Sequence, residues 1–176
     1  ILRNLPDGRS IVMATSKNGT IYAVDPDRQG RLVWKRAITD AFMIGGIGWG
    51  AAADDGNVYV AYWNGLTPKP GQPPGGITAL RIATGEPVWD AKATAVTCAW
   101  GSDGCMAAQR AAVTVIPGAV FSGSLDGHLR AYATKDGTLI WDADTGGPHK
   151  AVNGGDAVGG SIDSTGPVIV GGTLYV

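Results

Sequence analysis

The stretch "GSLDGHLRAYATKDGTLIWD" (123–142) contains a turn, a short strand, a second turn and a second strand, and it decides the fold because it recurs. The same order of features appears in "NGTIYAVDPDRQGRLVWK" (18–35) and "GGITALRIATGEPVWD" (75–90). Each copy has an alanine at a fixed place and a glycine four residues before a tryptophan. These residues are Ala23, Gly30 and Trp34, Ala79, Gly85 and Trp89, and Ala131, Gly137 and Trp141. The tryptophans stand 55 and 52 residues apart, close to the roughly 40–50 residues that form one four-stranded propeller blade.

The composition of the chain fits a compact, turn-rich protein. Of 176 residues, 44% are apolar and 16% are charged, and the 28 glycines and 10 prolines fall between apolar runs, where they mark turns. The net charge of −1 offers no field that would attract nucleic acid. The apolar-leaning run at 111–121 contains Pro117-Gly118 and is much shorter than the roughly 20 residues of a membrane span. We therefore expect no nucleic-acid partner and no membrane span.

Short β-branched and aromatic runs, bounded by turn residues, predict strands throughout the chain. They group into three units at about 9–38, 48–93 and 111–145, and a fourth unit begins at 160–176. No segment of ten or more residues has the 3.6-residue period of an amphipathic helix. The Pro- and Gly-rich insertion at 64–75 predicts an exposed loop. The first residue is Ile1 and the last residues, "GGTLYV", read as part of a strand, so we expect the chain to be an excerpt of a longer polypeptide.

Repeated four-stranded units must cover one another's apolar faces, and a radial arrangement of such units is a β-propeller. We therefore predict an all-β fold. It consists of one partial propeller domain over 1–176, with about three antiparallel blades and the start of a fourth. Side chains alternate between the faces of a strand, so the small Ala23, Ala79 and Ala131 leave space for a large ring. The three motif tryptophans are accordingly predicted to be inter-blade core.

The spacing of Ala, Gly and Trp resembles the tryptophan-docking repeat of quinoprotein (PQQ-type) β-propellers. The fuller form of that repeat has an acidic residue two positions after the alanine. Asp25 matches it, whereas Arg81 and Ala133 depart from it. The longer strings at 98–132 and 152–176 resemble polyvinyl-alcohol dehydrogenase and related quinoproteins of the bacterial periplasm.

This resemblance implies a periplasmic or secreted PQQ-dependent alcohol dehydrogenase. Such an enzyme oxidises an alcohol or polymeric alcohol by hydride transfer to pyrroloquinoline quinone, held near the axis with Ca²⁺, and passes electrons to a cytochrome c. The chain itself has no C-x-x-C-H haem motif. Non-catalytic relatives share the repeat, so the alternative is a propeller scaffold for protein–protein interaction, similar to the outer-membrane assembly lipoprotein.

Candidate site residues lie just before the predicted innermost strands, where a propeller brings its blades together. A planar tricarboxylate such as the quinone needs a flat floor, cationic or amide donors and an oxygen-ligated cation. We predict that Trp49, Gln109, Arg110 and Ser161 bind the cofactor. Asp163 is predicted either as a Ca²⁺ ligand or as the base that takes the alcohol proton. Capping of turns is the alternative role for all five.

The cysteines and histidines complete the candidates. In an exported protein, Cys98 and Cys105 would form a local disulfide; a metal site is the weaker alternative, because the chain has only these two Cys and two His. His128 takes the position of Thr20 in the repeat, which makes it a strand residue. His149 is predicted to lie in a loop.

Overall fold

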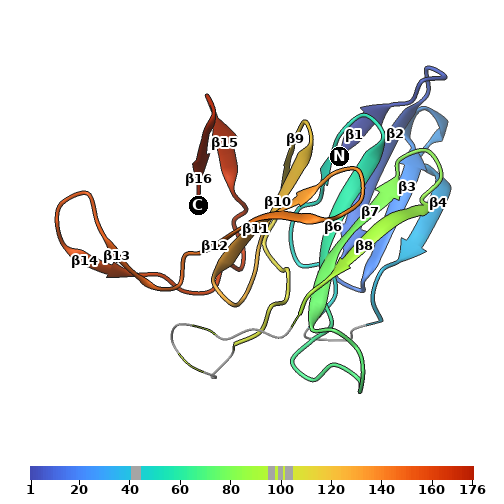
Figure 1. The fold of residues 1–176 in the computed structure, drawn as a ribbon. Helices are drawn as coiled ribbons and strands as arrows, with labels where there is room; N and C mark the ends of the chain where they lie inside the picture. Colours follow the sequence, from blue (N-terminus) through green and yellow to red (C-terminus); the bar gives the residue numbers. More distant parts are fainter. Residues whose placement is uncertain (41–44, 95–97, 99–100, 102–104) are drawn as a thin grey trace.

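The computed structural model describes residues 1–40, 45–94, 98, 101 and 105–176, and it is built from three four-stranded antiparallel sheets and two hairpins (Figure 1). The first sheet consists of β1 (Leu2–Asn4), β2 (Ser10–Ser16), β3 (Thr20–Asp25) and β4 (Arg31–Ala37). The second sheet consists of β5 (Ala52–Ala53), β6 (Asn57–Trp63), β7 (Gly75–Arg81) and β8 (Pro87–Lys92). The third sheet consists of β9 (Thr114–Ile116), β10 (Ala119–Gly123), β11 (His128–Ala133) and β12 (Leu139–Asp144). The hairpins pair β13 (Pro148–Lys150) with β14 (Asp156–Val158), and β15 (Val168–Val170) with β16 (Thr173–Tyr175).

In each sheet the strands follow one another in chain order, so every connection is a turn or loop between neighbours. The fold is therefore the predicted all-β arrangement of four-stranded antiparallel blades. The one short helical element among the described residues is the 3₁₀ turn η1 (Pro26–Arg28). It lies between Ala23 and Gly30, whose spacing is one residue longer than the alanine–glycine spacing in the other two repeats.

One strand, β1, and one hairpin, β13–β14, lie where the sequence predicts no strands. The first sheet includes β1, which lies upstream of the predicted unit. The sequence did not predict β1, because a three-residue strand is too short to show an alternating pattern. His149, predicted in a loop, is the middle residue of β13. The loop prediction was wrong because the polar run "PHK" pairs with a strand that lies beyond an intervening turn, and neither strand has a buried face.

The sheets stack face to face, and the middle sheet is buried on both sides. In β6, Val58, Val60 and Tyr62 pack against the first sheet, whereas Tyr59 and Ala61 pack against the third. This explains why β6 is an almost continuous apolar run in place of an alternating one: both of its faces are covered. The stacking is visible in Figure 1 as a succession from β1–β4 through β5–β8 to β9–β12.

The tryptophan of one sheet docks on the next sheet. Trp34 is buried and its Nε1 donates a hydrogen bond to the Ile82 carbonyl at 2.8 Å. A Cβ on Gly85 would lie 2.5 Å from the Trp34 ring. The motif glycine is therefore needed by the tryptophan of the preceding repeat.

The second junction repeats this geometry. Trp89 donates to the Thr134 carbonyl at 2.8 Å, and a Cβ on Gly137 would lie 2.6 Å from its ring. Trp141, after which the described residues form only two-stranded hairpins, is 43% exposed. Trp34 and Trp89 therefore pack between neighbouring sheets, as predicted. Trp141 does not, because its ring remains open to solvent.

The motif alanines mark a shared irregularity. Ala23, Ala79 and Ala131 each pair directly across the strands with the tryptophan of their own repeat, which gives the ring the space that was predicted. In all three sheets the register shifts immediately after this alanine. A bulge at this point bends the strand and increases its twist, so each repeat turns its tryptophan toward the next sheet in the same way.

Candidate functional site

The segments that precede β5, β9 and β15 converge, as expected for the approaches to innermost strands. The Val113 amide donates to the Gly50 carbonyl at 3.0 Å, and the Ala112 amide donates to the Ser164 carbonyl at 3.4 Å. A Cβ on Gly166 would lie 2.1 Å from the Ala112 carbonyl oxygen, so only glycine permits this approach. Backbone from three repeats therefore meets in one place.

Three of the predicted site residues come together there. The Nε atom of Arg110 lies 3.0 Å from Oδ1 of Asp163, and Trp49 Nε1 donates to the same oxygen at 3.3 Å. We call Trp49, Arg110 and Asp163 the axial cluster. All three remain accessible: the side chains of Arg110 and Asp163 are 26% and 43% exposed, and Trp49 is 46% exposed.

A fourth residue, Trp63, packs its ring against Arg110 of the axial cluster. The guanidinium carbon of Arg110 lies 4.6 Å from the centre of the Trp63 ring, within the range of a cation–π interaction. Trp63 is buried, and its indole N–H points to the Met106 sulfur at 3.1 Å. Trp63 is not among the site residues predicted from the sequence; its position at the end of β6, outside the tryptophan-docking motif, is the signal that could have revealed it.

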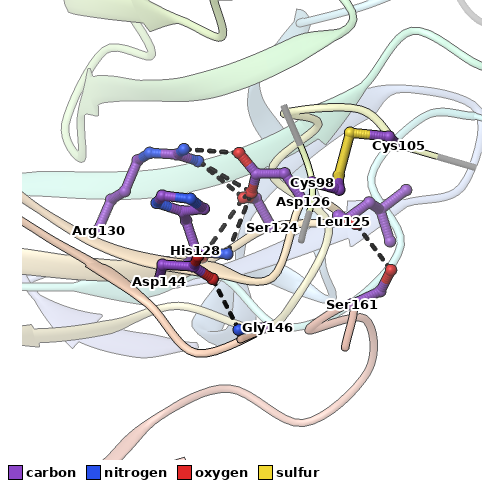
Figure 2. Close-up of a disulfide and its surroundings, with 10 residues drawn as sticks. All are labelled: Cys98, Cys105, Ser124, Leu125, Asp126, His128, Arg130, Asp144, Gly146 and Ser161. Carbon is purple, nitrogen blue, oxygen red and sulfur yellow. Dashed lines mark hydrogen bonds and ion pairs between the residues drawn. A yellow bond between two sulfur atoms is a disulfide. The ribbon is translucent and has the colours of Figure 1, made fainter. Parts of the chain in front are cut away.

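The structure does not bring Gln109 and Ser161 to the axial cluster. Gln109 is 1% exposed, and its Nε2 donates to the Tyr132 hydroxyl at 3.1 Å, on the side away from its neighbour Arg110. Ser161 donates to the Leu125 carbonyl at 2.7 Å, as Figure 2 shows, and so ties the chain before β15 to the third sheet. Consecutive residues of an extended segment point in opposite directions, which accounts for the divergence of Gln109 from Arg110.

The third sheet contains a buried ionic network that was not predicted from the sequence. Arg130 Nη2 lies 2.6 Å from Asp126 Oδ2, and its Nη1 donates to Ser124 at 2.8 Å (Figure 2). The Nε atom of Arg130 lies 3.2 Å from Oδ2 of Asp142. His128 Nδ1 lies 2.6 Å from the other oxygen of Asp142. Burial alone would raise the pKa of the Asp126 carboxyl, but hydrogen bonds from Arg130 and Ser124 outweigh burial and lower it. The network fixes the β10–β11 turn, and its sequence signal is the Asp-Gly turn followed by an arginine at i+4.

Cys98 and Cys105 form a disulfide, drawn beside this network in Figure 2. The bridge links two residues seven positions apart. It closes a local loop directly upstream of Gln109 and Arg110, and so restrains the segment that carries Arg110.

The family of the chain follows from its repeats. The family model described as outer membrane protein assembly factor BamB, PQQ_2, matches residues 17–176. The chain belongs to this PQQ-type repeat family. The family match covers all three tryptophan-docking motifs, so the PQQ-type propeller repeat predicted from them is confirmed.

Two curated relatives of this PQQ-type chain are polyvinylalcohol dehydrogenases. The one from a Pseudomonas species is 44% identical over 177 residues, and the one from Sphingopyxis sp. strain 113P3 is 42% identical over 180 residues. Both alignments cover 100% of this chain and 27% of the relative. The chain therefore spans about a quarter of the length of these relatives.

Solved structures show the same fold. BamB from Moraxella catarrhalis matches with a TM-score of 0.55 and 21% identity, covering 99% of this chain and 46% of that one. A europium-containing methanol dehydrogenase matches with a TM-score of 0.54 and 19% identity, covering 84% and 26%. The quinohemoprotein alcohol dehydrogenase ADHIIG from Pseudomonas putida HK5 matches with a TM-score of 0.53 and 13% identity, covering 78% and 25%. At these identities the likeness concerns the PQQ-type fold.

The axial cluster of this PQQ-type chain has donors that suit a planar anionic group. A guanidinium carries five N–H donors, more than one carboxylate oxygen uses, so Arg110 can hold a second acid beside Asp163. Trp49 offers an exposed aromatic ring. The cluster is less suited to a cation, because Ca²⁺ takes about six to eight oxygen ligands and the described residues contain no group of three or more His, Cys, Asp or Glu that could hold a metal.

Within the described part of the chain, no helix is long and apolar enough to cross a membrane.

Proposed function

We propose that this chain is part of a PQQ-dependent alcohol dehydrogenase that oxidises secondary alcohols, including polymeric ones. The observation that carries the proposal is the axial cluster: an arginine, a carboxylate and an exposed indole meet where three repeats converge. The 42–44% identity to polyvinylalcohol dehydrogenases across the whole chain supports this function over other functions of the same fold.

Each residue of the axial cluster has a distinct proposed role. Arg110, held over the Trp63 ring, would bind a carboxylate of the cofactor through its free N–H donors. Trp49 would stack against a planar ring. The quinone supplies the hydride acceptor when bound. The Asp163 carboxylate, exposed at 43%, would then accept the hydroxyl proton of the alcohol.

Gln109 and Ser161 would act on the cofactor site indirectly. Gln109 anchors the segment before Arg110 to Tyr132, and Ser161 anchors the segment before Asp163 to Leu125. These contacts would keep Arg110 and Asp163 in register with each other. This indirect role replaces the direct cofactor contact predicted from the sequence.

Three parts of this function depend on residues or conditions beyond the axial cluster. A Ca²⁺ ion bound through Asp163 would require further oxygen ligands from elsewhere in the protein. Transfer of electrons to a cytochrome c would require a docking surface for that partner. Export to the periplasm or the medium is supported by the Cys98–Cys105 disulfide, since disulfides persist in oxidising compartments.

The second candidate is a cofactor-free scaffold for protein–protein interaction. The family description favours it, because that description names the outer membrane protein assembly factor BamB, and BamB from Moraxella catarrhalis has the same fold. Under this hypothesis the Arg110–Asp163 ion pair would only tie two repeats together. The two candidates therefore differ in whether the axial cluster binds the quinone.

The deciding experiment is reconstitution of the longer protein that carries this chain with pyrroloquinoline quinone and Ca²⁺. Quinone retained after dialysis is read from its absorbance, and activity is read as dye reduction by propan-2-ol. We expect Asp163→Asn to retain quinone and to lower kcat at least about 100-fold, the usual contribution of a general base. We expect Arg110→Gln to weaken quinone retention.

The matched control is Asp7→Asn, which removes a carboxylate from the exposed Arg9–Asp7 pair in the β1–β2 turn, far along the chain from the axial cluster. It should leave both readouts unchanged. Absence of quinone uptake by the wild-type protein would rule out the dehydrogenase and favour the scaffold.

A further inference from the structure

Trp63 differs from the docked tryptophans in what its ring and its N–H contact. The indole N–H groups of Trp34 and Trp89 donate to backbone carbonyls of the next sheet. The Trp63 N–H donates to the Met106 sulfur at 3.1 Å. The face of its ring carries the Arg110 guanidinium, whose carbon lies 4.6 Å from the ring centre. Trp63 therefore contacts the segment that leads into the axial cluster, and it does so through both its ring and its N–H.

Trp63 is itself firmly held. It is 3% exposed and ends β6, where it pairs with Gly75 of β7. On its other side, the Trp63 amide donates to the Gly46 carbonyl at 3.0 Å, and the Gly46 amide donates back at 2.8 Å. An added Cβ on Gly46 would lie 2.1 Å from the Lys17 carbonyl oxygen, so Gly46 is also closely packed. The ring that contacts Arg110 is therefore a rigid support.

The segment that leads to Arg110 lies along the end of the second sheet with alternate residues. Met106 and Arg110 both contact the Trp63 indole. Between them, the Ala108 Cα would lie 3.3 Å from a Cβ on Gly75, the residue that pairs with Trp63. Residues at i, i+2 and i+4 of an extended segment share one side, so one side of this segment packs on the second sheet.

Both ends of this segment are fixed. At its start, the disulfide joins Cys105 to the buried Cys98, and Met106 follows directly. At its end, Arg110 Nε lies 3.0 Å from Asp163 Oδ1. Because Cys105 cannot move away from Cys98 while the disulfide is intact, Met106 is held beside the indole.

An arginine that is held in place before its ligand arrives binds that ligand at lower entropic cost. Arg is among the side chains that lose most rotamer freedom when they are fixed. The Trp63 ring and Asp163 already restrict Arg110 from two sides. The ion pair uses the Nε atom, and a guanidinium has four further N–H donors on its two Nη atoms. The support therefore restricts the side chain without using those donors.

We propose that Trp63 is a positioning residue of the axial cluster: its ring orients the Arg110 guanidinium toward an anionic group. Met106, held in place by the Cys98–Cys105 disulfide, orients the ring in turn. Where the anionic group is the quinone, this inference rests on the proposed function; the orientation of Arg110 does not.

The orientation of Arg110 is measured on the longer protein without quinone, by NMR of selectively labelled arginine side chains. Protons that lie over an aromatic ring are shifted upfield by its ring current. The signal of the Arg110 Cδ protons, assigned by its loss in Arg110→Gln, therefore reports contact with the Trp63 ring. We expect Trp63→Leu to move this signal downfield. Trp63→Phe keeps an aromatic face and should retain most of the upfield shift.

Met106→Leu tests the support of the ring, because it removes the sulfur acceptor at similar volume. It leaves the buried Trp63 N–H without this partner, so we expect the Arg110 signal to move downfield by less than in Trp63→Leu. The matched control is Met13→Leu, the same substitution in the core of the first sheet, which should leave the signal in place. If Trp63→Leu fails to fold, Met106→Leu carries the test.

The double change Cys98→Ser and Cys105→Ser tests the anchor of the segment. It frees the residue next to Met106 and should also move the Arg110 signal downfield. A signal that stays in place in this variant would overturn the role of the disulfide.

Quinone affinity tests the part that rests on the proposed function. We expect Trp63→Leu to raise the quinone dissociation constant at least about fivefold, the effect of one cation–π contact, and Trp63→Phe to recover most of the affinity. Unchanged affinity in a variant whose Arg110 signal has moved would overturn this part.

The two readouts separate the two proposals. A wild-type protein that binds no quinone, but whose Arg110 signal moves in Trp63→Leu, would rule out the dehydrogenase and support the positioning role. An Arg110 signal that stays in place in both Trp63→Leu and Met106→Leu would overturn the positioning role, whatever the quinone result.

Discussion

The substitution Gly85→Ala tests the docking geometry on which the stacking of the sheets depends. Gly85 has φ of +71°, and an added Cβ would lie 2.5 Å from Cε3 and 2.6 Å from Cδ2 of the Trp34 ring. That ring is buried and hydrogen-bonded to the Ile82 carbonyl at 2.8 Å. The new methyl group therefore meets a side chain that cannot move without losing a contact.

Three costs determine the size of the effect. A left-handed backbone costs a non-glycine residue about 1–2 kcal/mol. An extra methyl group in a packed core costs about 1–3 kcal/mol. Displacement of Trp34 weakens its hydrogen bond, which is worth about 0.5–1.5 kcal/mol. We expect Gly85→Ala to lower the free energy of unfolding by about 2.5 to 6.5 kcal/mol in total.

The assay is urea denaturation of the longer protein followed by far-UV circular dichroism. The matched control is Gly118→Ala: Gly118 has φ of +88°, and a Cβ there would meet nothing within 4 Å. It should cost only the backbone term, about 1–2 kcal/mol. If Gly85→Ala costs no more than Gly118→Ala, then Trp34 does not dock tightly on Gly85 and our account of the blade junction is wrong.

Three other perturbations test separate parts of the fold. Trp34→Phe leaves its carbonyl partner in the next sheet unbonded, so we expect a loss of about 1–3 kcal/mol in the same denaturation assay; a loss below that range would mean that water replaces the indole. Asp126→Asn breaks the buried pair with Arg130, with an expected loss of about 3–5 kcal/mol at pH 7. Because folding lowers the pKa of Asp126, this pair stabilises the fold above the unfolded-state pKa, about 4, and the stabilisation is lost as the pH falls through the folded-state pKa. The cost of Asp126→Asn should therefore shrink in acid, and a pH-independent cost would contradict the assignment. The double change Cys98→Ser and Cys105→Ser should cost about 2–3 kcal/mol from loop entropy, and an unchanged denaturation midpoint would show that the loop is ordered without its disulfide.

Most of the fold could be predicted from the sequence because its signals are local. Asx-Gly turns and the spacing of Ala, Gly and Trp indicate hairpins and their grouping into blades without any long-range information. The bulge after Ala79, in contrast, adds no distinctive residue to the sequence. Likewise, β1 and the β13–β14 hairpin are three-residue strands, which are too short to carry a period.

The candidate site, like the fold, could be predicted from the sequence only in part. The sequence placed Trp49, Arg110 and Asp163 at the approaches to inner strands, and that placement needs only the repeat and the topology of a propeller. It could not separate Arg110 from Gln109, because adjacent residues of an extended segment point to opposite sides and the direction depends on the local twist.

The sequence by itself determined the repeat, the all-β class and the family of this protein, because these depend on residue types at fixed spacings. Only the tertiary structure decided which side chains meet. The Arg110–Asp163 contact joins residues 53 positions apart, and the ring of Trp63, from the second sheet, lies under the Arg110 guanidinium. Each of these depends on how separate sheets stack, and stacking is set by packing between distant segments, which no local pattern specifies.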